Sequence, residues 1–173
     1  VLSIPHSIQG RVAKHQWLPS RGRQVATDIG PSQESLKRAA QLISGAKSPV
    51  IVAGRSVADA DAVSELVSLA ETIAAPVYTG NETRLIFPSN HPLYRGLAFQ
   101  QSHVLRRLAA SADVLLVIGS DIFKHDDPSE VPIVSADTRV IQIDLEARAL
   151  ARFCSTEMAL LANPKVALGA LED

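Results

Sequence analysis

The sequence predicts an α/β fold: a doubly wound, mostly parallel sheet of about six strands with helices on both faces. Three observations support this prediction. Short apolar runs alternate with stretches of helical periodicity almost throughout residues 32–171. One of these runs, Val114–Ile118, is uninterrupted, which is typical of a strand buried on both faces. The length of 173 residues suits one hydrophobic core and excludes two large domains.

The first helix–strand repeat begins after Pro31. Ser32 is suited to cap a helix, and Gly45 is suited to end it. The apolar face of this helix follows the i, i+3, i+4, i+7 spacing and consists of Leu36, Ala39, Ala40 and Ile43. Residues 49–53 then form a short buried strand.

The second repeat follows directly. We expect Asp59 to cap a helix whose apolar positions are Val63, Leu66, Val67, Ala70 and Ile73. Residues 75–78 are expected to form the second strand. Residues 87–96 contain prolines, which cannot donate backbone hydrogen bonds, so we predict a loop there.

The second half of the chain continues the alternation of strands and helices. The predicted elements are a helix at 102–110, a strand at 114–118, a strand at 139–143, a short helix at 146–152, a strand at 158–161 and a helix at 164–171. This order favours parallel strands joined by right-handed crossovers, an arrangement that is Rossmann-like.

The N-terminal part of the chain differs from the rest in composition. Val1–Ile4 looks like the end of a strand without its neighbours, closed by Pro5. Residues 9–31 are polar and basic and lack a sustained apolar period, which indicates a linker. We therefore assign residues 1–8 to the end of a preceding unit and residues 32–173 to the domain.

Composition and charge exclude several classes of function. The chain has 17 Lys and Arg residues against 18 Asp and Glu residues, so its formal net charge of −1 does not favour nucleic acid as a partner. Its apolar runs are far shorter than the roughly 20 residues of a membrane helix. The single cysteine, Cys154, cannot form an intrachain disulfide, and the sequence shows no signal peptide. We expect a cytoplasmic protein.

In a doubly wound sheet, ligands usually bind beyond the carboxyl ends of the strands. The loop after the first strand holds Gly54 and Arg55, but no two glycines of the chain are separated by a single residue. The G-x-G-x-x-G fingerprint of dinucleotide-binding folds is therefore absent. Gly54 could still let the backbone approach a phosphate. A lone glycine at a strand end is more often a turn residue, and we favour that interpretation.

The loop after the long apolar run is the richest polar cluster of the chain. It extends from Gly119 to Asp127 and holds His125 between Lys124 and Asp126. Neighbouring charges can bring a histidine pKa near neutrality, so His125 could act as an acid or a base; a solvated surface loop is the alternative. The adjacent carboxylates lack further oxygen ligands at a suitable spacing, so we predict no metal site.

Asp144 follows the strand at 139–143. An acidic side chain there can accept hydrogen bonds from ribose hydroxyls, or it can cap the segment that follows, and both roles stay open. The serine-hydrolase motif G-x-S-x-G does not occur, and Cys154 has no histidine near it in sequence, so its expected role is packing.

Five short segments, taken in order, carry a family resemblance. They are SPVIVAG at 48–54, APV at 75–77, FP followed by HPLYRG within 87–96, ADVLLVIG at 112–119 and VIQID at 140–144. With the elements around them they cover residues 32–171. In these segments the chain resembles the central domain of thiamine-diphosphate-dependent 2-oxo-acid enzymes, the group that contains benzoylformate decarboxylase and acetolactate synthase.

The resemblance implies that different domains have different roles in the full enzyme. In such enzymes the cofactor supplies the chemistry, because its thiazolium carbon attacks a 2-oxo acid and holds the carbanion after carbon dioxide leaves. The family carries the cofactor-activating glutamate in an N-terminal, pyrimidine-binding domain, whose last strand residues 1–8 resemble. It carries the Gly-Asp-Gly motif for Mg²⁺ and diphosphate in a C-terminal domain, and no Gly-Asp-Gly occurs here. The resemblance thus implies a middle, mainly structural domain that is inactive alone and belongs with sister domains in a homo-oligomer.

The resemblance also implies two alternatives for the site. On the benzoylformate decarboxylase side, the loop after the long strand contributes a histidine to the active site, and His125 is the nearest match. In acetolactate synthases and pyruvate oxidases the central domain binds FAD, and in oxalyl-CoA decarboxylases it holds a nucleotide. Here FAD or ADP would bind around Gly54, Arg55, Gly119 and Asp144. Asp121 stands where flavin-binding synthases have an arginine, and its charge disfavours a pyrophosphate there.

Overall fold

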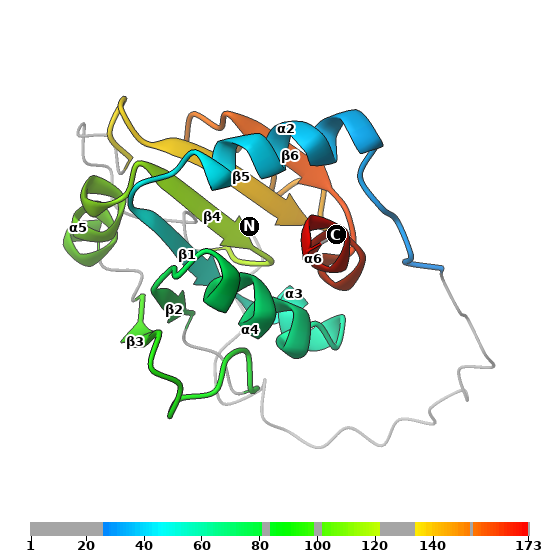
Figure 1. Cartoon of the computed structure of the whole chain (residues 1–173), viewed down its shortest axis with the longest axis horizontal. Coiled ribbons are helices and arrows are strands. Elements are labelled where there is room, and N and C mark those ends of the chain that lie inside the picture. Colours follow the sequence, from blue (N-terminus) through cyan, green and yellow to red (C-terminus); the bar gives the residue numbers. More distant parts are fainter. Residues whose placement is uncertain (1–25, 81–83, 99–101, 122–133, 153, 173) are drawn as a thin grey trace, which may run out of the picture.

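The computed structural model of the chain describes residues 26–80, 84–98, 102–121, 134–152 and 154–172. Within this part, six strands form one sheet in the order β3-β2-β1-β4-β5-β6, and every neighbouring pair is parallel (Figure 1). The strands are β1 (Pro49–Ala53), β2 (Val77–Thr79), β3 (Tyr94–Leu97), β4 (Val114–Ile118), β5 (Arg139–Asp144) and β6 (Met158–Leu161). The helices are α2 (Gln33–Ser44), α3 (Arg55–Asp59), α4 (Val63–Thr72), α5 (Ser102–Ser111) and α6 (Pro164–Glu172).

The strand order reverses between β1 and β4. The chain builds outward from β1 through β2 to β3, then crosses to the other side of β1 and continues from β4 to β6. β1 and β4 stay in register from Pro49↔Val114 to Ala53↔Ile118, so the two strands end side by side. Open α/β sheets bind ligands at such a switch point, beyond the carboxyl ends of the strands.

Helices cover both faces of the sheet, as the sequence predicts. On one face, α2, α4 and α6 pack against fully buried strand residues such as Ile51 and Leu116. On the other face, Leu108 of α5 packs in a second cluster with Val52 and Leu115. Figure 1 shows α5 apart from the other long helices. Because β1 and β4 are covered on both sides, every position along their central part is apolar.

The start of α2 confirms the predicted cap. The Ser32 hydroxyl accepts a hydrogen bond from the Ser35 backbone N–H at 3.2 Å, and Gly45 follows the last helical residue. Ala39 and Ile43 face the core. The helix therefore begins and ends where its capping residues place it.

The second predicted helix is α4, which begins at Val63, and Asp59 does not cap it. Asp59 is the last residue of α3, and its carboxylate binds Arg55 at 3.0 Å and also contacts Arg84. The residue before α4, Ala62, makes no side-chain capping bond. Between the helices, Asp61 has a φ of 53°, a left-handed conformation that aspartate tolerates better than most residues. This turn separates α4 from the short helix α3, which the sequence analysis did not predict.

The predicted loop at 87–96 is wrong in part, because residues 94–97 form the edge strand β3. Pro88 and Pro92 both precede this strand, so neither removes a donor from its pairing with β2. The pairing is short and shifts register between Val77 and Thr79. The second strand also begins and ends slightly later than the predicted 75–78.

Residues 146–152 form turns instead of the predicted short helix. The buried Gln142 side chain accepts a hydrogen bond from the Ala151 N–H at 2.6 Å, so this donor is taken by β5. Ala151 itself has a φ of 51°, which no α-helix contains. The Ala151 N–H is thus bonded to a side chain of the sheet instead of to a helical carbonyl.

The predicted linker reaches the domain surface at its end. Residues 26–31 hold neither helix nor strand, and the Ile29 carbonyl accepts a hydrogen bond from the Asn163 N–H at 2.8 Å. Residues 1–25 lie outside the described residues, so the assignments of 1–8 and most of 9–31 stay predictions. In the part of the chain that the structure describes, no helix has the length and apolar character to cross a bilayer.

Thr138 connects the end of α5 to the start of β5, and its replacement tests this connection. Its buried hydroxyl lies 2.9 Å from the Ala109 carbonyl and 3.0 Å from the Ala112 carbonyl. We expect Thr138→Val to lower the free energy of unfolding by about 1–2 kcal/mol, because the buried hydrogen bond that the single hydroxyl hydrogen makes with these carbonyls is lost. Urea unfolding measures the change. Thr72→Val, at an exposed position, is the control and should stay within about 0.5 kcal/mol; equal losses in both variants would contradict the assignment.

Candidate functional site

The loops that follow β1 and β4 touch each other at the switch point. The Gly54 N–H donates to the Ile118 carbonyl at 2.8 Å, and the Ser56 N–H donates to the Gly119 carbonyl at 3.2 Å. Both bonds join the two loops through their backbones. A backbone N–H at the start of α3, which in a nucleotide fold would face a phosphate, is thus bonded to protein.

The two glycines make this contact possible. A Cβ on Gly54 would lie 2.3 Å from the Gly119 carbonyl oxygen and 2.5 Å from the Ser120 Cα, both of which are backbone atoms. Gly119 has a φ of +59°, and a Cβ there would lie 2.5 Å from the Ser56 Cβ. Only residues without a side chain allow the loops to approach this closely. Of the two roles considered for Gly54, the geometry supports the close turn.

Arg55 is the first residue of α3, and its side chain is exposed to solvent. Its side chain is 70% exposed and forms an ion pair with Asp59 one turn further along α3. Asp59 also binds Arg84, so two guanidinium groups share one carboxylate. The Arg55 guanidinium is therefore bound to a carboxylate of its own helix.

Asp144 is the most buried carboxylate beside the switch point. Its Oδ1 accepts hydrogen bonds from the Ser56 hydroxyl at 3.2 Å and from the Glu146 N–H at 3.0 Å, so it caps the turn after β5 and ties β5 to α3. Burial raises the pKa of Asp144, and the charge of Asp121 adds to the rise, while hydrogen bonds from the Glu146 N–H, the Ser56 hydroxyl and the Leu145 N–H oppose it. The capping role is thus observed, and a ribose contact stays a prediction.

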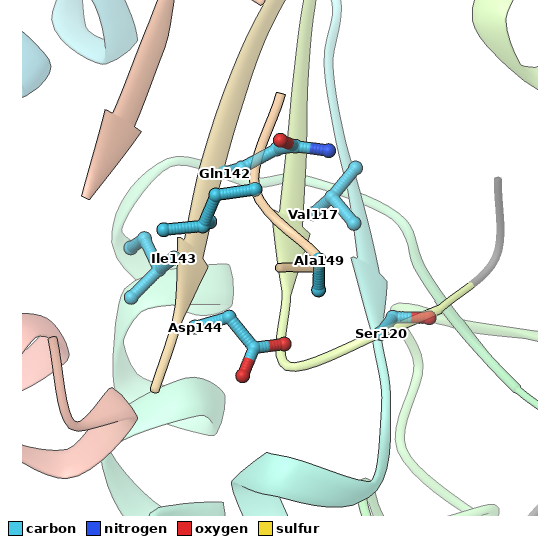
Figure 2. A pocket seen from close by; sticks show the side chains of 7 residues that line it. Val117, Ser120, Gln142, Ile143, Asp144 and Ala149 are labelled. Atoms are coloured by element: carbon cyan, nitrogen blue, oxygen red, sulfur yellow. The ribbon is translucent and has the colours of Figure 1, made fainter. Parts of the chain in front are cut away.

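Two hollows flank Asp144. The smaller one is shown in Figure 2, where Asp144, Ser120, Gln142 and Val117 surround a space of about 10 Å³, room for one water molecule at most. The larger one has a volume of about 340 Å³, which is within the range of small-ligand sites. Its lining residues are Thr27, Ser56, Asp59, Ala60, Asp144, Leu145, Glu146 and Asn163.

The larger hollow is acidic. Among the described residues that line it, Asp59, Asp144 and Glu146 carry carboxylates and none is basic. An anionic pyrophosphate would be repelled here, whereas a cation or a hydrogen-bond donor would be attracted. Asp144 and Glu146 therefore disfavour the phosphate part of FAD or ADP on their side of the hollow, whereas the charge of Asp59 is compensated by Arg55 and Arg84.

Several predicted site residues lie elsewhere or outside the described residues. His125, with Lys124, Asp126 and Asp127, falls within 122–133, so its role stays a prediction. In the part of the chain that the structure describes, no group of three or more His, Cys, Asp or Glu side chains could hold a metal ion. Cys154 is partly buried beside the core cluster of α5, and burial raises the pKa of its thiol, which fits a packing role.

The sequence analysis missed Ser56 and Gln142, although both organise the site. Ser56 bonds Asp144 through its hydroxyl, and Gln142 holds the turn at 146–152. Gln142 could have been noticed as a polar residue between two isoleucines of the strand VIQID. Ser56 offered no comparable signal, because a serine after a strand is common in turns.

Comparison with known proteins gives the class of this domain. A family model described as the thiamine pyrophosphate enzyme central domain matches residues 36–171. A sulfoacetaldehyde acetyltransferase of Castellaniella defragrans is 37% identical over 127 residues, covering 71% of this chain and 21% of that protein. A benzoylformate decarboxylase of Pseudomonas aeruginosa is 26% identical over 152 residues, covering 87% of this chain and 29% of that protein.

A solved structure agrees with these matches. The thiamine diphosphate-dependent 4-hydroxybenzoylformate decarboxylase of Rhodococcus jostii RHA1 superposes with a TM-score of 0.77 at 26% identity, covering 87% of this chain and 28% of that one. The chain belongs to the central-domain family of thiamine pyrophosphate (thiamine diphosphate) enzymes. It spans less than a third of the length of each of these relatives.

Replacing Gly54 by alanine tests the backbone contact at the switch point. We expect Gly54→Ala to lower the free energy of unfolding by about 2–3 kcal/mol, because the new methyl group meets backbone atoms that cannot move aside. Urea unfolding with circular dichroism measures the loss.

Gly169→Ala in α6 is the matched control for this substitution. A Cβ there meets nothing within 4 Å, and alanine favours a helix, so stability should stay equal or rise by up to about 1 kcal/mol. Equal effects of the two substitutions would show that the loops can separate.

Asp144→Asn tests the cost of the buried charge. The folded-state pKa of Asp144 is raised, so its ionised form destabilises the fold above that pKa, and the cost disappears as the pH falls and the group is protonated. We expect the stability of Asp144→Asn relative to the unmodified chain to be highest at neutral pH and to diminish on acidification. Urea unfolding across the acidic range measures this difference, with the exposed Asp137→Asn as control; a difference that grows on acidification would overturn the assignment.

Proposed function

We propose that the chain is the middle, mainly structural domain of a thiamine-diphosphate-dependent 2-oxo-acid decarboxylase or carboligase on the benzoylformate decarboxylase side of the family, and that it is inactive alone. The observation that carries the proposal is the backbone contact between Gly54 and Gly119. It occupies the place where other doubly wound domains hold a ligand.

The described residues of this chain do not fit thiamine diphosphate or its Mg²⁺. The sequence has no Gly-Asp-Gly, and the described residues hold no cluster of metal ligands. In the proposed enzyme both are bound by the sister N- and C-terminal domains, within a homo-oligomer. His125 is proposed to reach the substrate pocket only in that full enzyme.

A nucleotide-binding role is the less supported alternative. FAD or ADP would need Gly54, Arg55, Gly119 and Asp144 to surround a pyrophosphate and a ribose. Instead the two glycines face each other, and Arg55 is paired with Asp59. Asp144 and Asp121 bring negative charge to the same edge of the sheet.

A second candidate reaction follows from the sequence relatives. The acetyltransferase match has a higher identity than the decarboxylase match, 37% against 26%. The full enzyme would then be an acetyltransferase that acts on sulfoacetaldehyde. Since the present domain carries the scaffold in either case, the two reactions differ in domains beyond it.

Calorimetric titration of the chain with thiamine diphosphate plus Mg²⁺, FAD and ADP tests the structural role. We expect no saturable heat at ligand concentrations up to about 1 mM, because the site-forming groups are either absent or engaged. Saturable binding of FAD or ADP would favour the alternative, and binding of thiamine diphosphate would overturn the proposal. Assays of the full enzyme with 2-oxo acids and with sulfoacetaldehyde then distinguish the two reactions.

A further inference from the structure

His91 connects the end of α4 to the segment that leads into β3. Its side chain is 15% exposed, and its Nε2 lies 3.1 Å from a carboxylate oxygen of Glu71, near the end of α4. Its Nδ1 lies 3.2 Å from the Leu93 backbone nitrogen. The imidazole is therefore bonded through both nitrogens, once to a side chain and once to the backbone.

The contact with Leu93 defines the protonation state of the ring in this structure. A backbone N–H can only donate, so Nδ1 accepts the hydrogen bond from Leu93 and carries no proton itself. The single ring hydrogen is then on Nε2, which donates it to the Glu71 carboxylate. A neutral imidazole has one donor and one acceptor, and both are used here.

Leu93 links the ring to the sheet. Its N–H is bonded to His91, and its carbonyl accepts a hydrogen bond from the Val77 N–H at 2.9 Å, at the start of β2. Val77 is fully buried, so water cannot readily replace this bond. A movement of Leu93 away from the ring therefore also disturbs the pairing of β2 with the start of β3.

The edge strand β3 has few contacts that would resist such a movement. It contains four residues and pairs with β2 alone, and its register shifts between Val77 and Thr79. Gly96 within it has a φ of +99°, which is outside the range of a regular strand. Short elements with few hydrogen bonds belong to the part of a fold that opens most easily.

Aromatic packing holds the imidazole in its position. The buried Phe87 ring meets the His91 ring edge-on, with 5.0 Å between the ring centroids, and stacks on Tyr94 at 6.3 Å. The Tyr94 hydroxyl lies 3.2 Å from the Thr79 hydroxyl. These contacts restrict rotation of the imidazole, so Nδ1 keeps facing the Leu93 N–H.

The charges around the ring do not compensate for a proton on Nδ1. Among the described residues, Glu71 is the charged side chain bonded to the ring, and Arg95 is bonded to the Pro92 and Tyr94 carbonyls. Protonation would turn the Glu71 contact into an ion pair, but that side chain is 62% exposed, and exposed pairs are weak. The same proton would place two donors, Nδ1–H and the Leu93 N–H, against each other.

We propose that His91 is a pH-sensitive latch for the edge strand β3. The neutral ring holds Leu93 and keeps β3 paired with β2, whereas the protonated ring releases Leu93 and opens this end of the pairing. Histidine is suited to this role because its charge commonly changes between pH 5 and 8. The latch belongs to the fold of this domain and does not depend on the proposed function.

Amide hydrogen exchange, measured by NMR on the ¹⁵N-labelled 173-residue chain, tests the proposal. The ring nitrogen signals of His91 show which nitrogen is protonated at each pH, and we expect Nδ1 to be unprotonated in the neutral ring. Once the ring is protonated, the protection factors of the Leu93 and Val77 amides should fall at least about 10-fold, because local opening becomes easier. The amides of the central strand β4 should keep their protection.

His91→Asn is the matched variant. An asparagine side-chain oxygen can accept a hydrogen bond from the backbone N–H two residues further on, and it gains no proton in this pH range. The variant should therefore keep the Leu93 and Val77 amides protected at every pH. Glu71→Gln removes the carboxylate but leaves Nδ1 in place, so the fall in protection should remain. His103→Asn, on α5, is the control for loss of a histidine elsewhere and should behave like the unmodified chain.

Equal protection with the neutral and the protonated ring would overturn the latch, and so would a neutral ring with its proton on Nδ1. An equal fall in His91→Asn would also reject it. A fall that disappears in Glu71→Gln would assign the effect to the ion pair and reject the role of Nδ1. If His91→Asn does not fold, the unmodified chain and Glu71→Gln still decide between these outcomes.

Discussion

Backbone contact between the loops after β1 and β4 is the constraint on which the rest of the site depends. It requires glycine at both 54 and 119, and it directs the Ser56 hydroxyl toward Asp144. The contact closes the crevice that a reversed strand order creates. The domain therefore keeps the topology of a dinucleotide-binding fold while its own backbone fills the central position. A scaffold role in a larger enzyme is consistent with this arrangement.

Polar side chains of β5 extend the same constraint to the edge of the sheet. Gln142 and Asp144 lie on one face of the strand, and both hold the backbone that follows β5 through hydrogen bonds to Ala151 and Glu146. The turns at 146–152 are thereby fixed beside the end of α3. Their position leaves the acidic hollow open beside the end of β5.

Most of the fold was predictable from the sequence because its core strands are buried on both faces. β1, β4 and β5 appear as largely apolar runs that end next to Gly54, next to Gly119 or at Asp144. The predictions that proved wrong concern segments whose conformation depends on a contact with another element. Asp59 was expected to cap a helix, but in the structure its carboxylate binds Arg55 and Arg84. Residues 146–152 have a helical pattern that the side chain of Gln142 overrides.

The sequence by itself determined the alternation of strands and helices, the family resemblance and the absence of a glycine-rich phosphate loop. These features depend on local periodicity and on short motifs, both of which involve residues close together in the sequence. Only the tertiary structure decided that Gly54 and Gly119 meet, that Ser56 bonds a carboxylate 88 positions away, and that Ile29 lies against the start of α6. Such contacts join residues far apart in the chain, and their geometry follows from strand order and register, which local patterns do not encode.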